Sequence, residues 1–156
     1  MAKKHRLQVA YSDDFSVIGI ATQLKDFKMC LFLNQALGTR LVRDGEMHVS
    51  LAGGNQTAAF PFFRYFDAPN KINWYFVANR NHEQQLMISE IKQFSFFLIN
   101  DGIPPFMSLA DFIASVNHIN NVQIAQEISP QRHKELGFML QDLEMHILEL
   151  DRKNKP

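Results

Sequence analysis

Glu90 is the residue of this chain that is best placed for chemistry. It stands near the head of residues 87–101 (MISEIKQFSFFLIND), whose second half is apolar on both alternating faces. A carboxylate at the end of a core strand can act as a general acid or base, but this role normally needs a second positioned group. The neighbouring sequence offers no such partner. We therefore interpret Glu90 as a structural residue that pairs with Lys92 or Arg80.

The other residue types that support catalysis or metal binding follow no informative spacing. The six histidines include no i, i+4 pair and no Cys-x-x-Cys companion, so zinc has no local signature, although a long-range site stays open. Gly53, Gly54 and Asn55 lack the Lys-Ser/Thr of a phosphate-binding loop. Cys30 lies on the apolar face of a predicted helix, where a thiol behaves as a small hydrophobe. The sequence predicts no catalytic residue, metal or cofactor, and it does not favour an enzyme.

Hydrophobic patterning predicts the elements that hold these residues. Strands are expected at 5–11, 15–21, 40–51, 58–67, 72–79, 91–100 and 122–127, and helices at 25–37, at 108–118 and from Ser129 to about Lys153. The glycines of residues 52–56 mark a hairpin turn. This order predicts an α+β fold: a mostly antiparallel sheet of about five to seven strands, an early buried helix and two C-terminal helices, the last one long. We expect the helices to pack on one face of the sheet.

Length and composition limit the class of protein. With 156 residues, of which 46% are hydrophobic, the chain suits a single domain over 1–156, with fraying expected at about 1–5 and 152–156. Acidic and basic residues both number 16, which disfavours broad nucleic-acid binding. The single cysteine, an N-terminus without the apolar core of a secretory signal, and the absence of a long apolar run predict a cytoplasmic protein with no membrane contact.

Asn34 falls inside the apolar face of the first predicted helix. This broad face contains Phe27, Cys30, Leu31, Leu33 and Leu37, and we expect it to be buried against the sheet. A buried amide must find hydrogen-bond partners. We therefore predict that Asn34 is a structural pin that bonds to backbone groups at a neighbouring strand end.

Four segments and one motif occur in an informative order. The segments are 15–20 (FSVIGI), 25–38 (KDFKMCLFLNQALG), 63–67 (FRYFD) and 74–80 (WYFVANR), and the motif is 88–96 (ISEIKQFSF). Together they resemble the IPExxxVDY family, small proteins found in Bacteroidota, over roughly residues 7 to 101. In the motif only Ile88 and Glu90 match strictly. The resemblance implies no activity, and Ser95 and Phe96 stand where the family has its acid and its hydroxyl, so Glu90 lacks those partners for catalysis.

Two predicted strands interleave aromatic and cationic side chains, as platforms for single-stranded nucleic acid do. The candidates are Arg64, Tyr65, Trp74 and Arg80. Core packing needs most aromatics of a chain with 14 phenylalanines, and a net charge of zero withholds attraction to phosphate. An RNA-contacting module is therefore an alternative function. A pocket for a small apolar or acyl ligand is a further alternative, based only on abundant Phe and Met.

The final helix carries the leading functional hypothesis. Its main stripe, predicted to dock within the monomer, is Leu136, Met139, Leu140, Leu143, Ile147 and Leu150. Phe138 and Met145 project roughly 160° away from that stripe, with Leu148 between. They are either isolated exposed hydrophobic residues, which are common, or an interface for a protein partner or a second copy in antiparallel pairing. The leading interpretation is a non-catalytic protein-interaction module or homodimer.

Overall fold

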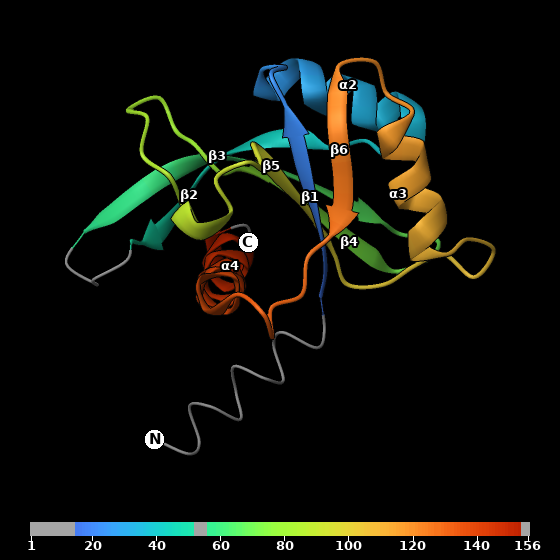
Figure 1. The fold of residues 1–156 in the computed structure, drawn as a ribbon. Helices are drawn as coiled ribbons and strands as arrows, with labels where there is room; N and C mark the ends of the chain where they lie inside the picture. Colours follow the sequence, from blue (N-terminus) through green and yellow to red (C-terminus); the bar gives the residue numbers. More distant parts are fainter. Residues whose placement is uncertain (1–14, 52–55, 154–156) are drawn as a thin grey trace.

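The computed structural model describes residues 15–51 and 56–153 (Figure 1). Within them, six strands form one antiparallel sheet in the order β2-β3-β4-β5-β1-β6. The strands are β1 (Ser16–Thr22), β2 (Val42–Ser50), β3 (Thr57–Asp67), β4 (Ile72–Ala78), β5 (Phe96–Asn100) and β6 (Val122–Glu127), and the helices are α2 (Asp26–Leu37), α3 (Leu109–Asn117), α4 (Lys134–Lys153) and the short 3-10 turn η1 (Ser89–Ile91). The predicted α+β fold, with its long last helix, is confirmed.

Helices cover both faces of the sheet, so the expectation of a single covered face is wrong. Helices α2 and α3 pack on one face and α4 on the other (Figure 1). The physical reason lies in the central strands, which are apolar on both sides. In β5, Phe96 and Leu98 join the core under α2 and α3, whereas Phe97 and Ile99 join the core under α4. Two apolar faces each need a covering layer.

Two predicted boundaries lie five residues from those in the structure (96 − 91 and 134 − 129). Strand β5 begins at Phe96 and not near Ile91, because the preceding residues form η1 and a turn. Helix α4 begins at Lys134 and not at Ser129, because the intervening residues form a turn closed by the Arg132 N–H and the Ser129 carbonyl, 3.1 Å apart. By contrast, Ser108 caps α3 with a reciprocal capping box, as its sequence indicates.

Some predictions fall wholly or partly on residues outside those that the structure describes. They are the strand at 5–11, most of the turn at 52–56, and the fraying at 1–5 and at 154–156. Within the segment 152–156 that was expected to fray, Arg152 and Lys153 belong to helix α4. The two strands that the turn at 52–56 was expected to join, β2 and β3, are antiparallel neighbours in the sheet.

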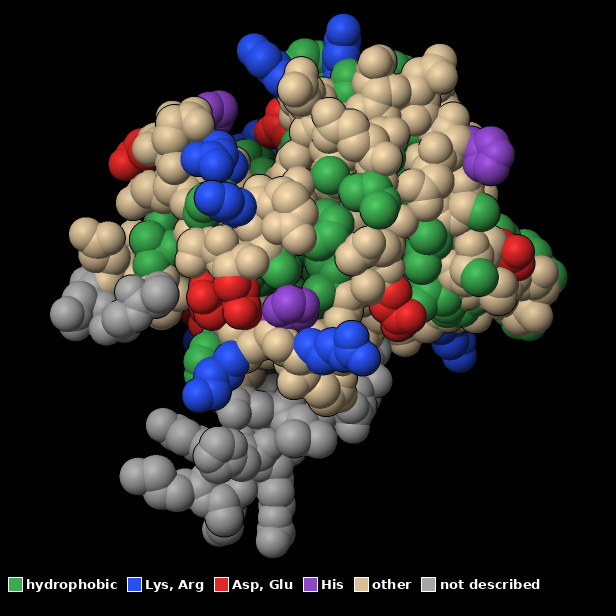
Figure 2. Space-filling model, viewed as in Figure 1, with side chains coloured by type: hydrophobic (Ala, Val, Ile, Leu, Met, Phe, Trp, Pro, Cys, Tyr) green, Lys and Arg blue, Asp and Glu red, His purple; other side chains and the backbone are tan. Residues whose placement is uncertain are grey.

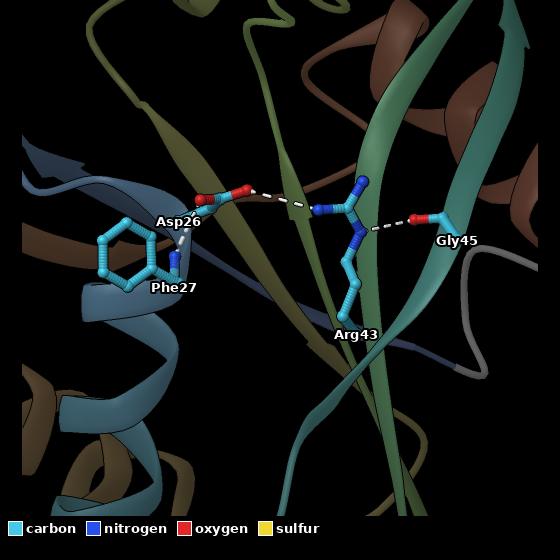
Figure 3. Close-up of polar contacts among 4 residues, drawn as sticks. All are labelled: Asp26, Phe27, Arg43 and Gly45. Carbon is cyan, nitrogen blue, oxygen red and sulfur yellow. Dashed lines mark hydrogen bonds and ion pairs between the residues drawn. The ribbon is translucent and has the colours of Figure 1, made fainter.

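Strand β2 is distorted opposite a proline of β3. Arg43 pairs with Phe63, whereas Glu46 pairs with Pro61, so β2 contains an extra residue between them. Gly45 supplies the left-handed backbone with a φ of 65°, which glycine adopts without strain. Pro61 has no N–H to donate to the ladder, and a bulge in the partner strand accommodates this loss. Arg43 reaches from this bulge to Asp26 at the start of α2 (Figure 3), and its guanidinium lies 3.8 Å from the Asp26 carboxylate.

Gly19 of β1 lets two segments that are far apart in sequence meet over the sheet. A Cβ at this position would collide with Ile128 Cδ1 and lie 2.8 Å from Phe94 Cγ. Real Cβ atoms do not approach carbon so closely, so only glycine fits here without rearrangement. Phe94 and Ile128 therefore rest directly on the β1 backbone. This contact brings the η1 turn beside the segment that leads into α4.

Candidate functional site

Helix α4 has two apolar faces, and the residues that the structure describes bury only one of them. The inner face packs on the core as predicted: Leu136, Met139, Leu140 and Leu143 are buried, and Ile147 and Leu150 are partly buried against the same cluster. On the other face, Phe138 is 46%, Met145 59% and Leu148 56% exposed. We call these three residues the outer stripe. A helix that only covers a sheet needs one apolar stripe, so the core does not account for the outer one.

The outer stripe follows the spacing of a helix-pairing seam. Met145 lies seven residues after Phe138, and Leu148 three residues after Met145. In helices that pair with another helix, the apolar residues alternate at intervals of three and four residues and so repeat every seven. This spacing keeps them in one line along the helix. Gln141 occupies the remaining position of this line, between Phe138 and Met145. The three exposed side chains are therefore aligned along the helix axis.

The flanks of the outer stripe are acidic. From 135 to 151 the helix carries five carboxylates and no lysine or arginine; they are Glu135, Asp142, Glu144, Glu149 and Asp151. The cationic residues of α4 are Lys134 at its first position and Arg152 and Lys153 at its last two. The middle of the outer surface thus combines apolar side chains with negative charge.

Two of these carboxylates also fasten α4 to the sheet. Asp142 Oδ2 accepts a hydrogen bond from the Ser50 N–H of β2 at 3.2 Å. Burial raises the pKa of Asp142, and the Ser50 amide partly opposes this shift. Asp151 lies 3.9 Å from Arg64 of β3, whose guanidinium also pairs with Asp44 at 3.0 Å. Because these contacts lie at both edges of the helix, they fix which face of α4 points outward.

His146 sits at the edge between α4 and the sheet. Its ring contacts Phe62 edge-on at 4.7 Å between centroids, and its Nε2 is buried without a hydrogen-bond partner among the described residues. Burial lowers the pKa of His146 below 6.5, with the carboxylates of Asp44 and Glu149 opposing the shift. The folded chain therefore favours the neutral imidazole.

We expect His146→Leu to reduce the loss of stability on mild acidification. Because the pKa of His146 is lowered in the folded state, the unfolded chain binds more protons just below pH 6.5, and the free energy of unfolding falls as pH drops through this window. Urea unfolding from about pH 7.5 to about pH 5 measures this slope for both proteins. His82→Leu, at an exposed position, is the control. Equal slopes in wild type and His146→Leu would contradict the expectation.

Glu90 lies in the η1 turn, 3.7 Å from His133 Nδ1. The prediction that it begins a strand and pairs with Lys92 or Arg80 is wrong, because the chain turns at η1 and carries Glu90 toward the start of α4. Arg80 instead donates to the Gln84 carbonyl at 3.1 Å. The Glu90–His133 distance exceeds hydrogen-bond range, so this is an ion pair only while His133 is protonated.

Asn79 and Asn81 hold the loop that presents Glu90. The fully buried Asn79 amide accepts from the Ile88 N–H at 2.8 Å and donates to the Phe94 carbonyl at 2.9 Å. Asn81 accepts from the Glu83 and Gln85 N–H groups through its Oδ1. Buried amides that satisfy several backbone groups fix a loop in one conformation. Sequence reasoning missed both residues, although two asparagines just after a strand are typical of such a loop.

A pocket of about 460 Å³ adjoins the Glu90–His133 pair. Its lining includes Phe94 and Ile128, with Gln126, Glu127, Arg132 and His133 as polar groups. Figure 2 shows hydrophobic side chains gathered at the centre of this face, above a histidine with acidic and basic side chains beside it. Nearby, the Ser129 hydroxyl donates to Gln131 Oε1 at 2.7 Å and not to an imidazole. The arrangement does not assemble a nucleophile with its base.

A second polar pocket, of about 350 Å³, contains two histidines. His48 and His82 line it together with Glu46 and Glu83. Across residues 15–51 and 56–153, however, no group of three or more His, Cys, Asp or Glu side chains is arranged to hold a metal ion. The long-range metal site that the sequence left open is therefore not assembled in this part of the chain.

The candidate nucleic-acid residues do not form one exposed platform. Trp74 is 2% exposed and packs edge-on against Phe112, 5.0 Å between ring centroids. The prediction that it stacks on RNA is wrong, because the α2–α3 layer covers its face of the sheet. Tyr65 is partly buried against the same core, and Arg64 is engaged by Asp44.

Asn34 bonds to backbone groups just before β2, as predicted, and also to one side chain. Its amide donates to the Leu41 carbonyl at 3.1 Å and accepts from the Leu41 N–H and the Thr39 hydroxyl, each at 2.8 Å. These bonds connect α2 to the start of β2. The buried Cys30 thiol donates to the same carbonyl, and burial raises its pKa to about 11. A thiol in this state is a poor nucleophile at neutral pH.

The apolar face of α2 is buried only in part. Phe27 is 62% and Leu31 52% exposed, so the expectation that both face the sheet is wrong. In Figure 3, the Phe27 ring points away from Arg43, while Asp26 reaches toward it. Helix α2 is apolar around most of its circumference, and the sheet covers only the side that carries Met29, Cys30 and Leu33. Phe27 and Leu31 form a smaller exposed pair that serves below as a control.

An apolar hollow of about 350 Å³ lies where α2 meets the connection from α3 to β6. Phe32, Ala36 and Ile119 line it together with Gln35 and Asn120. Its volume is at the lower limit of pockets that take drug-sized ligands. Binding of a small apolar or acyl ligand stays a prediction. Within the described ranges, no helix is both long and apolar enough to cross a membrane.

No protein-family model, curated protein or solved structure matches this chain. The resemblance to the IPExxxVDY family therefore stays a prediction.

Proposed function

We propose that this chain is a non-catalytic protein-interaction module that binds another protein through the outer stripe of α4. The proposal rests on one observation: α4 buries one apolar stripe in the core of the chain and exposes a second apolar stripe aligned along its axis. Single exposed hydrophobic residues need no explanation. Three of them in line on one helix, at the spacing of a pairing seam, match the way that helices dock on partners.

The geometry near Glu90 gives less support to catalysis. Its carboxylate lies 3.7 Å from the imidazole of His133, and His133 Nδ1 makes no hydrogen bond in the part of the chain described. A general base is normally held by a hydrogen bond to the group that orients it. The contact, which is an ion pair only while His133 is protonated, instead joins η1 to the segment just before α4, and this fits a structural role.

Copurification from the native host tests the proposal. Phe138→Glu combined with Met145→Lys places one charge of each sign on the outer stripe and leaves the net charge unchanged. Phe27→Glu combined with Leu31→Lys makes the same substitution types at the exposed pair of α2, and is the matched control. Urea unfolding first shows that both variants retain wild-type stability within about 1 kcal/mol, as exposed positions allow.

We expect recovery of the bound protein to fall at least about tenfold with the α4 variant and to stay unchanged with the α2 variant, because central apolar contacts dominate binding energy. Equal recovery with the wild type and the α4 variant would overturn the proposal.

A further inference from the structure

The charges around the outer stripe select the chemistry of its partner. In a pair of helices, the residues that flank the apolar seam lie close to the flanking residues of the other helix. Here Glu135 and Glu149 lie on one flank and Glu144 on the other, while Asp142 and Asp151, on the same two edges, also contact the sheet. Opposite charges at flanking positions favour a pairing, and like charges oppose it.

We infer that the partner presents an amphipathic helix whose apolar residues meet the outer stripe and whose flanking positions carry lysine or arginine. This inference rests on the proposed function and names the partner's chemistry. Phe138, Met145 and Leu148 contribute the apolar contact, and each is about half exposed before binding. The acidic flanks then set the sign of the charge that the partner must bring.

A second copy of the chain is a poor occupant for the same surface. Self-pairing, parallel or antiparallel, places acidic flanks against acidic flanks. In an antiparallel pair centred on the stripe, Phe138 would meet Leu148 of the other copy, and Lys134 would then meet Arg152. Like charges would thus face one another along the flanks and at both ends of the seam. The homodimer form of the interaction hypothesis is therefore disfavoured.

Synthetic helical peptides provide the probe. The first peptide has leucines at the seam positions and lysines at the flanks; the second has the same leucines with glutamates at the flanks; the third contains the residues of the first in scrambled order. Fluorescence anisotropy measures the binding of each to the full chain. We expect the lysine-flanked peptide to bind at least about tenfold more tightly than either control, with affinity that falls as salt rises.

Charge reversal separates this inference from a general loss of folding. Glu149→Lys keeps the outer stripe and the sheet contacts of Asp142 and Asp151, and it reverses one exposed carboxylate on a flank. We expect this variant to bind the lysine-flanked peptide more weakly and the glutamate-flanked peptide more tightly than the wild type does. A damaged fold would weaken both. Phe138→Glu combined with Met145→Lys is expected to abolish binding of either peptide.

The outcomes distinguish the inference from the proposed function. The lysine- and glutamate-flanked peptides could bind equally well and both lose binding in Phe138→Glu combined with Met145→Lys. This result would overturn the inference about the partner's charge and leave the proposed function standing. Equal binding of the scrambled peptide would show non-specific attraction and overturn the inference. If no peptide binds, the inference is wrong, and the copurification result alone then decides the proposed function. Stable self-association of the wild type in sedimentation would identify a second copy as the occupant and also overturn the inference.

Discussion

Trp74→Ala is expected to lower the free energy of unfolding by about 3–5 kcal/mol, the range for truncating a buried large aromatic side chain. Trp74 is among the largest fully covered side chains, and its ring lies edge-on to Phe112 of α3. Removing it would leave a cavity between the sheet and the α2–α3 layer. Urea unfolding measures the loss. A total stability of about 5–15 kcal/mol is typical, so this variant would be close to unfolding.

Tyr65→Ala is the matched control, because Tyr65 pairs with Trp74 across β3 and β4 but is only partly buried. Its loss is expected to be less than half as large. A loss below about 1 kcal/mol for Trp74→Ala would contradict the packing described. The result also bears on the RNA alternative, since reduced RNA binding by Trp74→Ala would report unfolding. Arg80, which is exposed, is the more informative position for testing that alternative.

Asn79→Ala is expected to cost about 3 kcal/mol, because it removes a fully buried amide that satisfies backbone groups of the η1 loop. Each buried group left without a partner costs about 1–3 kcal/mol. The Ile88 N–H and the Phe94 carbonyl both lose their contact with this side chain. Urea unfolding gives the global loss, and hydrogen exchange at the Ile88 amide gives the local one.

Asn120→Ala, at an exposed position, is the control for Asn79→Ala and is expected to change stability by less than about 0.5 kcal/mol. Unchanged protection of the Ile88 amide in Asn79→Ala would show that other contacts hold the loop. The Glu90–His133 ion pair would then not depend on the asparagine.

Local patterns predicted that the central strand is covered on both faces, although the expectation that the helices pack on one face of the sheet was wrong. The alternation from Phe96 to Ile99 indicated a strand covered on both faces, and the structure has that arrangement. Gly38 ends α2 in the left-handed conformation, with a φ of 70°, as its place after an apolar run indicates. These features depend on side-chain period and on the backbone of one residue, which a single sequence displays.

Features that depend on contacts between distant segments were not visible in the sequence. Glu90 meets His133 only because Phe94 and Ile128 pack together over Gly19. Nor could periodicity assign the exposed side of α2, since apolar residues lie around most of that helix and the strand positions decide which side is covered. The outer stripe of α4 was visible because its two apolar faces are separated by polar residues. The sequence did not show that acidic residues flank the outward face, because the contacts of Asp142 and Asp151 with the sheet determine which face points outward.

The methyl resonance of Met145 reports directly whether a helix docks on the outer stripe of α4. Met145 lies in the middle of the outer stripe, whereas Met139 of the same helix is buried in the inner face. With both methyl groups labelled, titration of the full chain with the lysine-flanked peptide is expected to shift the Met145 signal saturably and to leave the Met139 signal nearly unmoved. If the peptide binds saturably and the Met145 signal does not move, the peptide contacts another surface, and docking on the outer stripe is contradicted.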